Sequence, residues 1–291
     1  MNMKYVSICS IMKNEENYLD EWLFFHINIG IEHFYLYDND TENKEQILKI
    51  IKKYDKYVTL YSISGKVQQL NAYNHCLSQH KNDTHWLATI DLDEFLIPNK
   101  KDDLKDAISS YEQFDGIGIN WLMFGNNGHE KIDNNYSVID RFNKCCEPDN
   151  NLDHSLESTN KFDPCCHIKT IAKPTKILSY PNPHFAIYKN NGFACDEKKN
   201  LINGSNKKIG FAGTNFVSHD FLQVNHYSVK SWEEFKKRRT QPLADSFTIP
   251  EFYKSENLRN TFEKLNYENN SVINNRAKEL IKSFNNRLER I

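Results

Sequence analysis

Three carboxylates stand directly after a strand-like run in the segment WLATIDLDEFLIP, residues 86–98. They are Asp91, Asp93 and Glu94, and the apolar run before them is typical of a buried strand. Open parallel sheets bind ligands beyond the carboxyl ends of their strands, so we expect Asp91 and Asp93 to face a ligand. Carboxylates suit hard cations such as Mg²⁺ or Mn²⁺, which also bind substrate phosphates. The motif therefore predicts a metal-bound diphosphate, with a helix cap or a solvated turn as the alternative.

Polar residues also follow the other predicted strands. They are Asn14 and Glu15 after the first, Asp38, Asn39 and Asp40 after the second, and Lys66, Gln69 and Asn74 after the third. Any one cluster fits a turn or a helix cap equally well. Four clusters at one edge of a sheet indicate a binding site more strongly than one cluster does.

The elements that must position these residues alternate along the first 120 residues. Predicted strands begin at residues 5, 33, 57, 85 and 116, and helical patterns near 15–29, 43–54, 67–80 and 102–112 lie between them. In the first helical pattern Leu19, Trp22, Leu23 and Ile27 recur at helical spacing, which indicates a core face. This order predicts an α/β fold in which a mostly parallel sheet is flanked by helices on both faces.

The second half of the chain has a different pattern. From 121 to 215 the periodicity weakens into long loops around short strands, and such loops usually shape a site. After residue 230 the chain becomes helical again, starting at a capping box formed by Ser231 and Glu234. A final apolar stripe indicates a helix packed on the domain, and its residues are Ile273, Ala277, Leu280, Ile281, Phe284 and Leu288. We therefore expect a catalytic domain over 1–230 and a helical extension over 231–291.

The composition excludes several classes of partner. The net charge of −2 comes from 37 basic and 39 acidic residues, so no overall field attracts nucleic acid or an anionic membrane. No stretch has the length of a transmembrane segment and the N-terminus does not resemble a signal peptide, so we expect a cytoplasmic protein, in the host cytoplasm if the source is a virus. The oligomeric state is left open.

Seven cysteines without a secreted-domain pattern fit a reducing compartment. Two vicinal pairs, Cys145–Cys146 and Cys165–Cys166, the second followed by His167, raise the possibility of structural zinc. Because adjacent cysteines rarely point at one ion and the spacing matches no usual finger, loop thiols are the favoured interpretation.

Several segments together resemble a known family. KNEENYLDEWLFFHINIGIEHFYLYDND, KVQQLNAYNHCL, WLATIDLDEFLIP, GIGINWLMFG and VNHYSVKSWEEF occur in this order from about residue 5 to 239. They are similar to the GT-A fold glycosyltransferases related to families 2 and 92. DLDEF alone is a weak signal, but KNEE, YDND, DLDEFL and NHYSVKS in sequence are specific.

The resemblance implies a nucleotide-sugar donor, most simply a UDP-sugar, and a glycan or other hydroxyl-bearing acceptor. Asp38 would contact the nucleobase or ribose, with Asn14 and Glu15 lining the same pocket. Asp91 and Asp93 fall on the D-x-D motif that binds Mn²⁺ or Mg²⁺, and His226 matches a histidine that completes the metal shell. The rest of the donor site would consist of Lys66, Gln69, Asn74 and Lys230, with the two lysines near the diphosphate.

The catalytic base is not placed by any motif. Glu130, the residue we choose, and Asp133 follow the glycine-bearing segment after residue 121, and His184 is a further candidate. Trp121 fits either stacking on a sugar ring or a core position. Two rival interpretations remain: a phosphatase of the haloacid dehalogenase type, which also uses D-x-D, and a sugar-nucleotide-binding protein without activity.

Overall fold

The computed structural model describes residues 3–133, 135–148, 164–202, 213–240, 253–254 and 257–288. Elements of the first half are β1 (Lys4–Met12), α1 (Leu19–Asn28), β2 (His33–Asp38), α2 (Lys44–Lys53), β3 (Val58–Ser62), α3 (Gln69–His80), β4 (Thr84–Thr89), β5 (Glu94–Pro98), α4 (Leu104–Ile108), β6 (Gly116–Met123), α5 (Val138–Arg141) and β7 (Lys144–Cys145). Those of the second half are η2 (Pro164–Cys166), β8 (Ile168–Ala172), β9 (Ile177–Ser179), β10 (Ile187–Tyr188), β11 (Ala194–Cys195), β12 (Leu201–Ile202), β13 (Leu222–His226), α6 (Trp232–Arg239), α7 (Leu258–Asn269), β14 (Val272–Ile273) and α8 (Arg276–Leu288).

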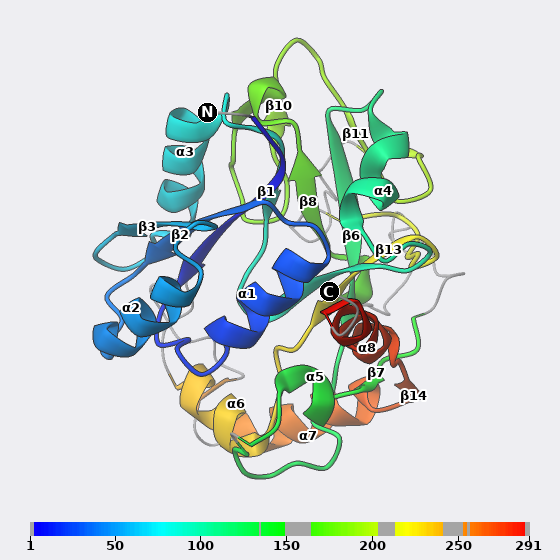
Figure 1. Cartoon of the computed structure of the whole chain (residues 1–291). Helices are drawn as coiled ribbons and strands as arrows, with labels where there is room; N and C mark the ends of the chain where they lie inside the picture. The colour runs from blue at the N-terminus through cyan, green and yellow to red at the C-terminus, as the bar shows by residue number, and fades with distance from the viewer. Residues whose placement is uncertain are drawn as a thin grey trace.

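The main sheet has the strand order β12-β11-β6-β8-β4-β1-β2-β3 (Figure 1). β3, β2, β1 and β4 are parallel, and their register places Met12, Asp38 and Ser62 side by side where β1, β2 and β3 end. β8 runs antiparallel between β4 and β6. The predicted fold class, a mostly parallel sheet flanked by helices, is confirmed.

Alternation along β1 explains the two layers of helices. Val6 and Ile8 pack into a large apolar cluster with residues of α1, α2, α4 and α8, whereas Cys9 and Ile11 pack into a second cluster with α3. Successive side chains of a strand point to opposite faces, so both faces of the sheet are covered. α1 ends at Asn28, and Gly30 in the turn that follows has a φ of 103°, a conformation that favours glycine.

The predicted helices and strands of the first half are all present. In α1, Leu19, Trp22 and Leu23 are buried and Ile27 is partly buried against the same core, as the periodicity predicts. β5 was not predicted. Its residues follow the acidic motif directly, and it pairs with β13 rather than with its sequence neighbours.

The last helix packs on the sheet with most of the predicted stripe. Ala277, Leu280 and Phe284 are buried in the large cluster, and Phe284 contacts Phe25 of α1 with ring centroids 6.0 Å apart. The placement of Ile273 on this stripe was wrong, because it belongs to β14 and is 64% exposed. The side chain of Leu288 lies outside the described residues.

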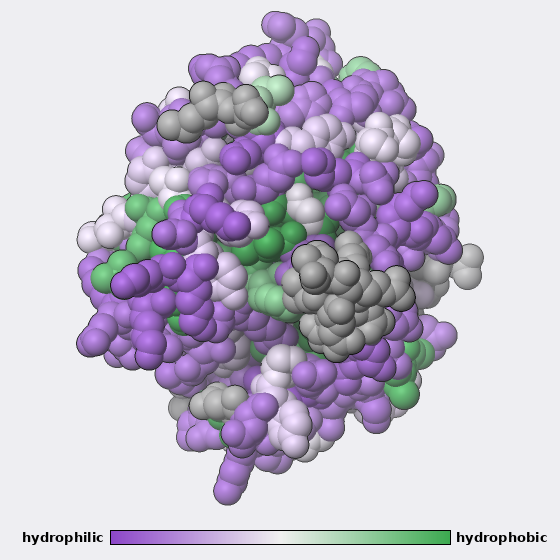
Figure 2. All heavy atoms as spheres, viewed as in Figure 1, coloured by the Kyte–Doolittle hydropathy of each residue, from purple (hydrophilic) through white to green (hydrophobic). Residues whose placement is uncertain are grey.

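Figure 2 shows a largely hydrophilic surface on the face of Figure 1, with hydrophobic side chains gathered near the middle of the view, around α1. Within the described part of the chain no helix is both long and apolar enough to span a membrane.

Candidate active site

The loops after β1, β2, β3 and β4 meet at the carboxyl edge of the sheet around a cleft of about 560 Å³. Its lining residues are Ile11, Met12, Lys13, Glu15, Asn39, Asp40, Glu42, Gly65, Lys66, Val67, Gln69, Asp91, Leu92, Asp93 and Arg238. A volume of this size accommodates a typical small-molecule ligand. The clustering of polar strand ends that the sequence predicts therefore coincides with a cleft.

Hydrogen bonds between loops hold the wall of this cleft together. The Asp40 carboxylate accepts bonds from the Ser64 hydroxyl (2.8 Å) and the Gly65 N–H (2.9 Å). Asn39 donates to the Gly65 carbonyl (2.9 Å), and the side chain of Asn14 accepts a bond from the Glu42 N–H (2.9 Å). The loops after β1, β2 and β3 are thus linked to one another before any ligand arrives.

Asp91 is held by a buried lysine. Its Oδ2 accepts a bond from Lys169 Nζ at 2.9 Å, and its Oδ1 accepts one from Gln69 Nε2 at 2.7 Å. The Glu94 carboxylate lies 3.4 Å from the same ammonium and accepts a bond from the Asp91 N–H. Burial alone would lower the pKa of Lys169, but Asp91 and Glu94 outweigh it and raise that pKa. Burial also raises the pKa of Glu94 well above its usual value.

Asp93 is the second carboxylate of the motif, and its side chain is 1% exposed. Its Oδ2 accepts a hydrogen bond from Arg238 of α6 and lies 3.4 Å from His226 Nε2. Burial would raise the pKa of Asp93, but the charge of Arg238 and the interaction with His226 hold it well below the usual value. Asp93 Oδ1 is buried and has no hydrogen-bond partner among the described residues.

Strand pairing explains why His226 lies beside a residue so distant in sequence. β13 runs antiparallel to β5 with His226 opposite Glu94, and the Tyr227 N–H donates to the Asp93 carbonyl at 2.8 Å. β13 also pairs with β6 in parallel, so its position is fixed from both sides. Burial lowers the pKa of His226, which favours the neutral imidazole that can bind a metal.

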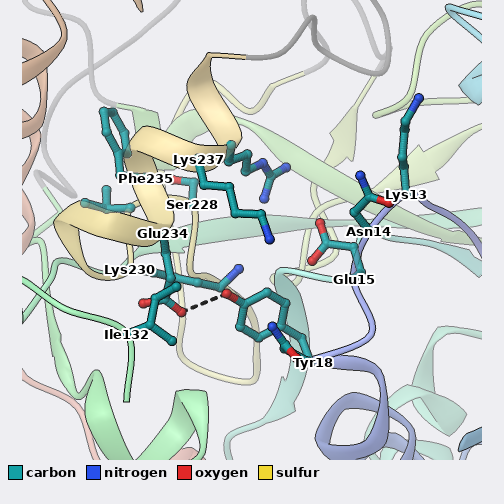
Figure 3. A pocket seen from close by; sticks show the side chains of 13 residues that line it. Lys13, Asn14, Glu15, Tyr18, Ile132, Ser228, Lys230, Glu234, Phe235 and Lys237 are labelled. Carbon is teal, nitrogen blue, oxygen red and sulfur yellow. Dashed lines mark hydrogen bonds between the residues drawn. The ribbon is translucent and has the colours of Figure 1, made fainter. Parts of the chain in front are cut away.

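A smaller pocket adjoins the cleft and shares Lys13, Glu15 and Arg238 with it. Figure 3 shows Lys237 extending from α6 toward Glu15. Lys230 is 5% exposed, has a left-handed φ of 54°, and places its ammonium 4.1 Å from the centroid of the Tyr18 ring. Burial raises the pKa of Glu15 even though Lys230 and Arg238 oppose it. This side of the cleft therefore carries several cations.

Some predicted site residues do not line the cleft. Asp38 is buried, and its Oδ1 accepts a bond from the Thr41 N–H at 3.1 Å, as in a turn. Asn74 bonds the backbone of Tyr180 through both side-chain atoms. Asn14 lines only the smaller pocket. Lys66 and Gln69 do line the cleft, with Lys66 exposed and Gln69 buried against Asp91.

The structure does not bring Glu130 to the cleft. Its side chain is 52% exposed and forms an ion pair with Arg259 at 2.8 Å, so it lacks the access to a cleft ligand that a base requires. Asp133 caps its own turn by accepting a bond from the Asn135 N–H. Trp121 packs against His167, His184 and His226, with ring centroids 4.3–5.1 Å apart.

A divalent cation fits two of its three predicted ligands. Asp93 offers an unpartnered buried oxygen, and His226 lies next to the same carboxylate. Asp91 fits less well, since Lys169 and Gln69 already bond its two oxygens. Within the described residues, no group of three histidine, cysteine, aspartate or glutamate side chains is arranged around one point. Oxygens of a bound phosphate would have to complete the coordination.

Sequence reasoning missed Lys169 and Arg238. Lys169 is the second residue of the largely apolar strand IKTIA. A lysine buried there requires a carboxylate partner, which is a readable signal. Arg238 belongs to the basic run KKRR, in which no residue stands out, and only the packing of α6 selects it.

An α/β sheet with a polar cleft beyond its parallel strand ends defines the class of proteins that bind nucleotides and similar ligands at that edge. The model of glycosyltransferase family 92 matches residues 4–265, so this chain belongs to glycosyltransferase family 92.

Relatives are distant. A family 92 glycosyltransferase protein of Oryza sativa subsp. japonica is 23% identical over 235 residues, covering 79% of this chain and 34% of the relative. One from Ricinus communis is 21% identical over 236 residues, covering 79% and 36%. The chain thus spans about a third of the length of these relatives.

The similarity to solved structures is weak. S. aureus TarS 1–349 in complex with UDP is 19% identical, with a TM-score of 0.37 over 59% of this chain and 47% of that chain. The galactosyltransferase LgtC in complex with donor and acceptor sugar analogs is 10% identical, with a TM-score of 0.35 over 91% and 97%. Scores this low support no inference about this chain.

Proposed function

We propose that this chain transfers a monosaccharide from a nucleoside diphosphate sugar, a UDP-sugar in the first instance, to a hydroxyl group of a glycan. Membership of glycosyltransferase family 92 supports the reaction class. The observation that carries the proposal is the cluster of Asp93, His226 and Arg238 beside the carboxyl-edge cleft. Asp93 and Arg238 line the cleft, and His226 lies 3.4 Å from Asp93 although 133 residues separate their positions in the sequence.

The nucleoside would lie against the loops after β2 and β3. Asn39, Asp40 and Lys66 line this part of the cleft, and the bonds from Ser64 and Gly65 to Asp40 fix its shape. A wall that is already ordered loses little conformational entropy when the ligand binds.

The diphosphate would lie toward α6, where Arg238 reaches the cleft and Lys230 and Lys237 line the adjoining pocket. An arginine can bond two phosphate oxygens at once, and charge-assisted bonds of this kind are about twice as strong as neutral ones. Arg238 would then offset the charge on the leaving diphosphate, while the pair formed by Lys169 and Asp91 keeps the motif in place.

Mn²⁺ or Mg²⁺ would be held by Asp93 and His226 together with phosphate oxygens of the donor. The unpartnered Asp93 Oδ1 supports this part of the proposal. When bound, such a cation stabilises the negative charge that develops on the leaving diphosphate.

The proposal includes a hexose as the transferred sugar and a single displacement with inversion at the anomeric carbon. A displacement of this kind needs a group that takes the proton of the acceptor hydroxyl. We leave this base unassigned, because Glu130 is exposed and paired with Arg259.

A donor assay tests the proposal. The full chain is incubated with a panel of nucleotide sugars and a mixed glycan acceptor, with Mn²⁺ or with a chelator, and released nucleoside diphosphate is measured. We expect release that depends on Mn²⁺ and is lost in Asp93→Asn. Glu130→Gln is the matched control and should keep the activity. Release that survives Asp93→Asn would refute the mechanism, release of inorganic phosphate would identify a phosphatase, and binding without release would identify a binding protein.

A further inference from the structure

The two vicinal cysteine pairs have no part in the proposed transfer, yet all four of their thiols are buried. Cys145 and Cys146 stand at and just after β7, while Cys165 and Cys166 belong to η2. The Sγ atoms of Cys146 and Cys165 lie 2.8 Å apart. The two thiols are therefore in direct contact, although 18 residues separate them in the sequence.

We propose that Cys146 and Cys165 are a dithiol site that is converted reversibly into a disulfide by exchange with a low-molecular-weight disulfide such as glutathione disulfide. The site is independent of the proposed transferase function. Each vicinal pair contributes one cysteine to the contact.

Both cysteines are fixed to the same strand, β6. The Cys146 N–H donates to the Met123 carbonyl at 2.8 Å. The Asn120 side chain, which is 1% exposed, donates to the Cys165 carbonyl at 3.0 Å. Because these anchors are three residues apart on one strand, the thiols are held close together without any covalent bond. The bond can then form with little movement of the backbone.

A small disulfide can reach only one of the two sulfurs directly. Cys146 is 9% exposed and lines a cleft of about 360 Å³ together with Leu122 of β6 and Gln223 of β13, whereas Cys165 is fully buried. Cys145 lines the same cleft, but burial and the neighbouring Cys146 raise its pKa to about 12. A thiolate is the attacking species in exchange, so Cys145 is a poor competitor.

The exchange has two balanced steps. Cys146 Sγ attacks one sulfur of glutathione disulfide and forms a mixed disulfide, and one glutathione leaves with the proton of Cys146. Cys165 Sγ then attacks Cys146 Sγ, the bond to glutathione breaks, and the second glutathione leaves with the proton of Cys165. The two cysteine sulfurs are oxidised and the two glutathione sulfurs are reduced.

The cross-link would close a ring that contains residues 147–164. Closing a ring of this size reduces the conformational freedom of the unfolded chain, so the oxidised protein should have a melting temperature roughly 5–10 °C above that of the reduced protein.

Thiol counting with peptide mapping tests the proposal. The full chain is equilibrated with glutathione disulfide or with dithiothreitol, denatured, alkylated and measured by intact mass. All seven cysteines should be alkylated after reduction and five after oxidation, with a non-reduced peptide that joins Cys146 to Cys165. Seven alkylated cysteines after oxidation, a glutathione retained on Cys146, or a different linked pair would each overturn the proposal.

Variants separate this pair from its neighbours. In Cys146→Ser the same six cysteines should be alkylated after reduction and after oxidation. In Cys145→Ser six cysteines should be alkylated after reduction and four after oxidation. Loss of the cross-link in folded Cys145→Ser would show that the vicinal partner is the true member of the pair. If Cys146→Ser fails to fold, mapping of the wild-type protein still decides the matter, because it needs no variant.

Discussion

At the scale of single residues, Lys169 sets the charge balance of the acidic motif. It is 1% exposed and lies within 3.4 Å of both Asp91 and Glu94. Removing one partner of a buried ion pair leaves the other charge uncompensated. We therefore expect Lys169→Met to lower the free energy of unfolding by roughly 3–5 kcal/mol in urea denaturation. Lys66→Met replaces an exposed lysine of the same cleft and should change the free energy of unfolding by no more than about 0.5 kcal/mol. A loss below about 1 kcal/mol for Lys169→Met would contradict this role.

Arg238 also bonds a carboxylate, but unlike Lys169 it lines the cleft and can contact a ligand there. We expect Arg238→Gln to weaken UDP binding roughly 10- to 100-fold in isothermal titration calorimetry, the value of one or two charge-assisted bonds. Arg238→Lys should lose less, since it keeps the charge. Lys236→Gln, an exposed change on the same helix, should leave the affinity unchanged. If the wild-type protein and the three variants bind UDP with equal affinity, Arg238 is not part of the proposed donor site.

Residue types and the family resemblance predicted part of this candidate site. Asp91 and Asp93 were found because acidic residues at the end of an apolar strand are unusual, and His226 because of the family motif. The partners that neutralise these carboxylates were not found, because Lys169 and Arg238 lie 78 and 145 residues away from them in sequence. Pairing of this kind is decided by packing, which local spacing does not encode.

At the scale of elements, α6 is tied to α5 by a buried ion pair. Glu234 completes the predicted capping box with Ser231. It also accepts bonds from both terminal Nη atoms of Arg141, at 2.7 and 2.8 Å, and from the Tyr18 hydroxyl. Burial would raise the pKa of Glu234, but Arg141, Ser231 and Tyr18 lower it from 4.5 to about 2. The element that carries Arg238 therefore depends on an ionised glutamate.

This pKa predicts how stability depends on pH. A carboxyl group whose pKa is lower in the folded protein than in the unfolded protein stabilises the folded state. This contribution is complete at a pH above the pKa of the unfolded protein, and it is lost as the pH falls through the pKa of the folded protein. When the pH is lowered from 5 to 2, the free energy of unfolding of the wild-type protein should fall by on the order of 3 kcal/mol more than that of Glu234→Gln, as measured by urea denaturation. Parallel pH profiles for the two proteins would show that the pair contributes nothing.

Elements were predicted well where they obey a regular period. α1, α2 and α3 and the parallel strands between them follow simple apolar patterns, and the capping box located α6. β8 lies centrally between β4 and β6, yet it is only five residues long and contains Lys169, so it appeared as part of a loop region. β5 was hidden because it begins within the acidic motif.

At the scale of the whole molecule, α8 packs into the same apolar cluster as the sheet. Phe284 is 1% exposed and contacts Phe25 of α1. We expect Phe284→Ala to cost roughly 3–5 kcal/mol and to lower the stability of the sheet as well as of the helix. The free energy of opening measured by hydrogen exchange of the β1 amides should fall by the same amount. If exchange changes only in α8, the helix is a separately folding extension rather than part of the core.

The double pairing of β13 has a consequence for how such a chain can diversify. His226 is held by β5 and β6, and Lys169 by the strands on either side of β8, so the stretches 124–167 and 173–221 are each pinned to the sheet at both ends. Doubling the length of a flexible stretch with fixed ends costs only about 0.6 kcal/mol in closure entropy. Length changes in the connections between the elements of both stretches can therefore accumulate while the carboxylates, the histidine and the cations keep their geometry, whereas β11 belongs to the main sheet and α5 carries Arg141, the partner of Glu234. The scaffold in this way separates the paired elements, whose positions the sheet fixes, from connections whose lengths can change.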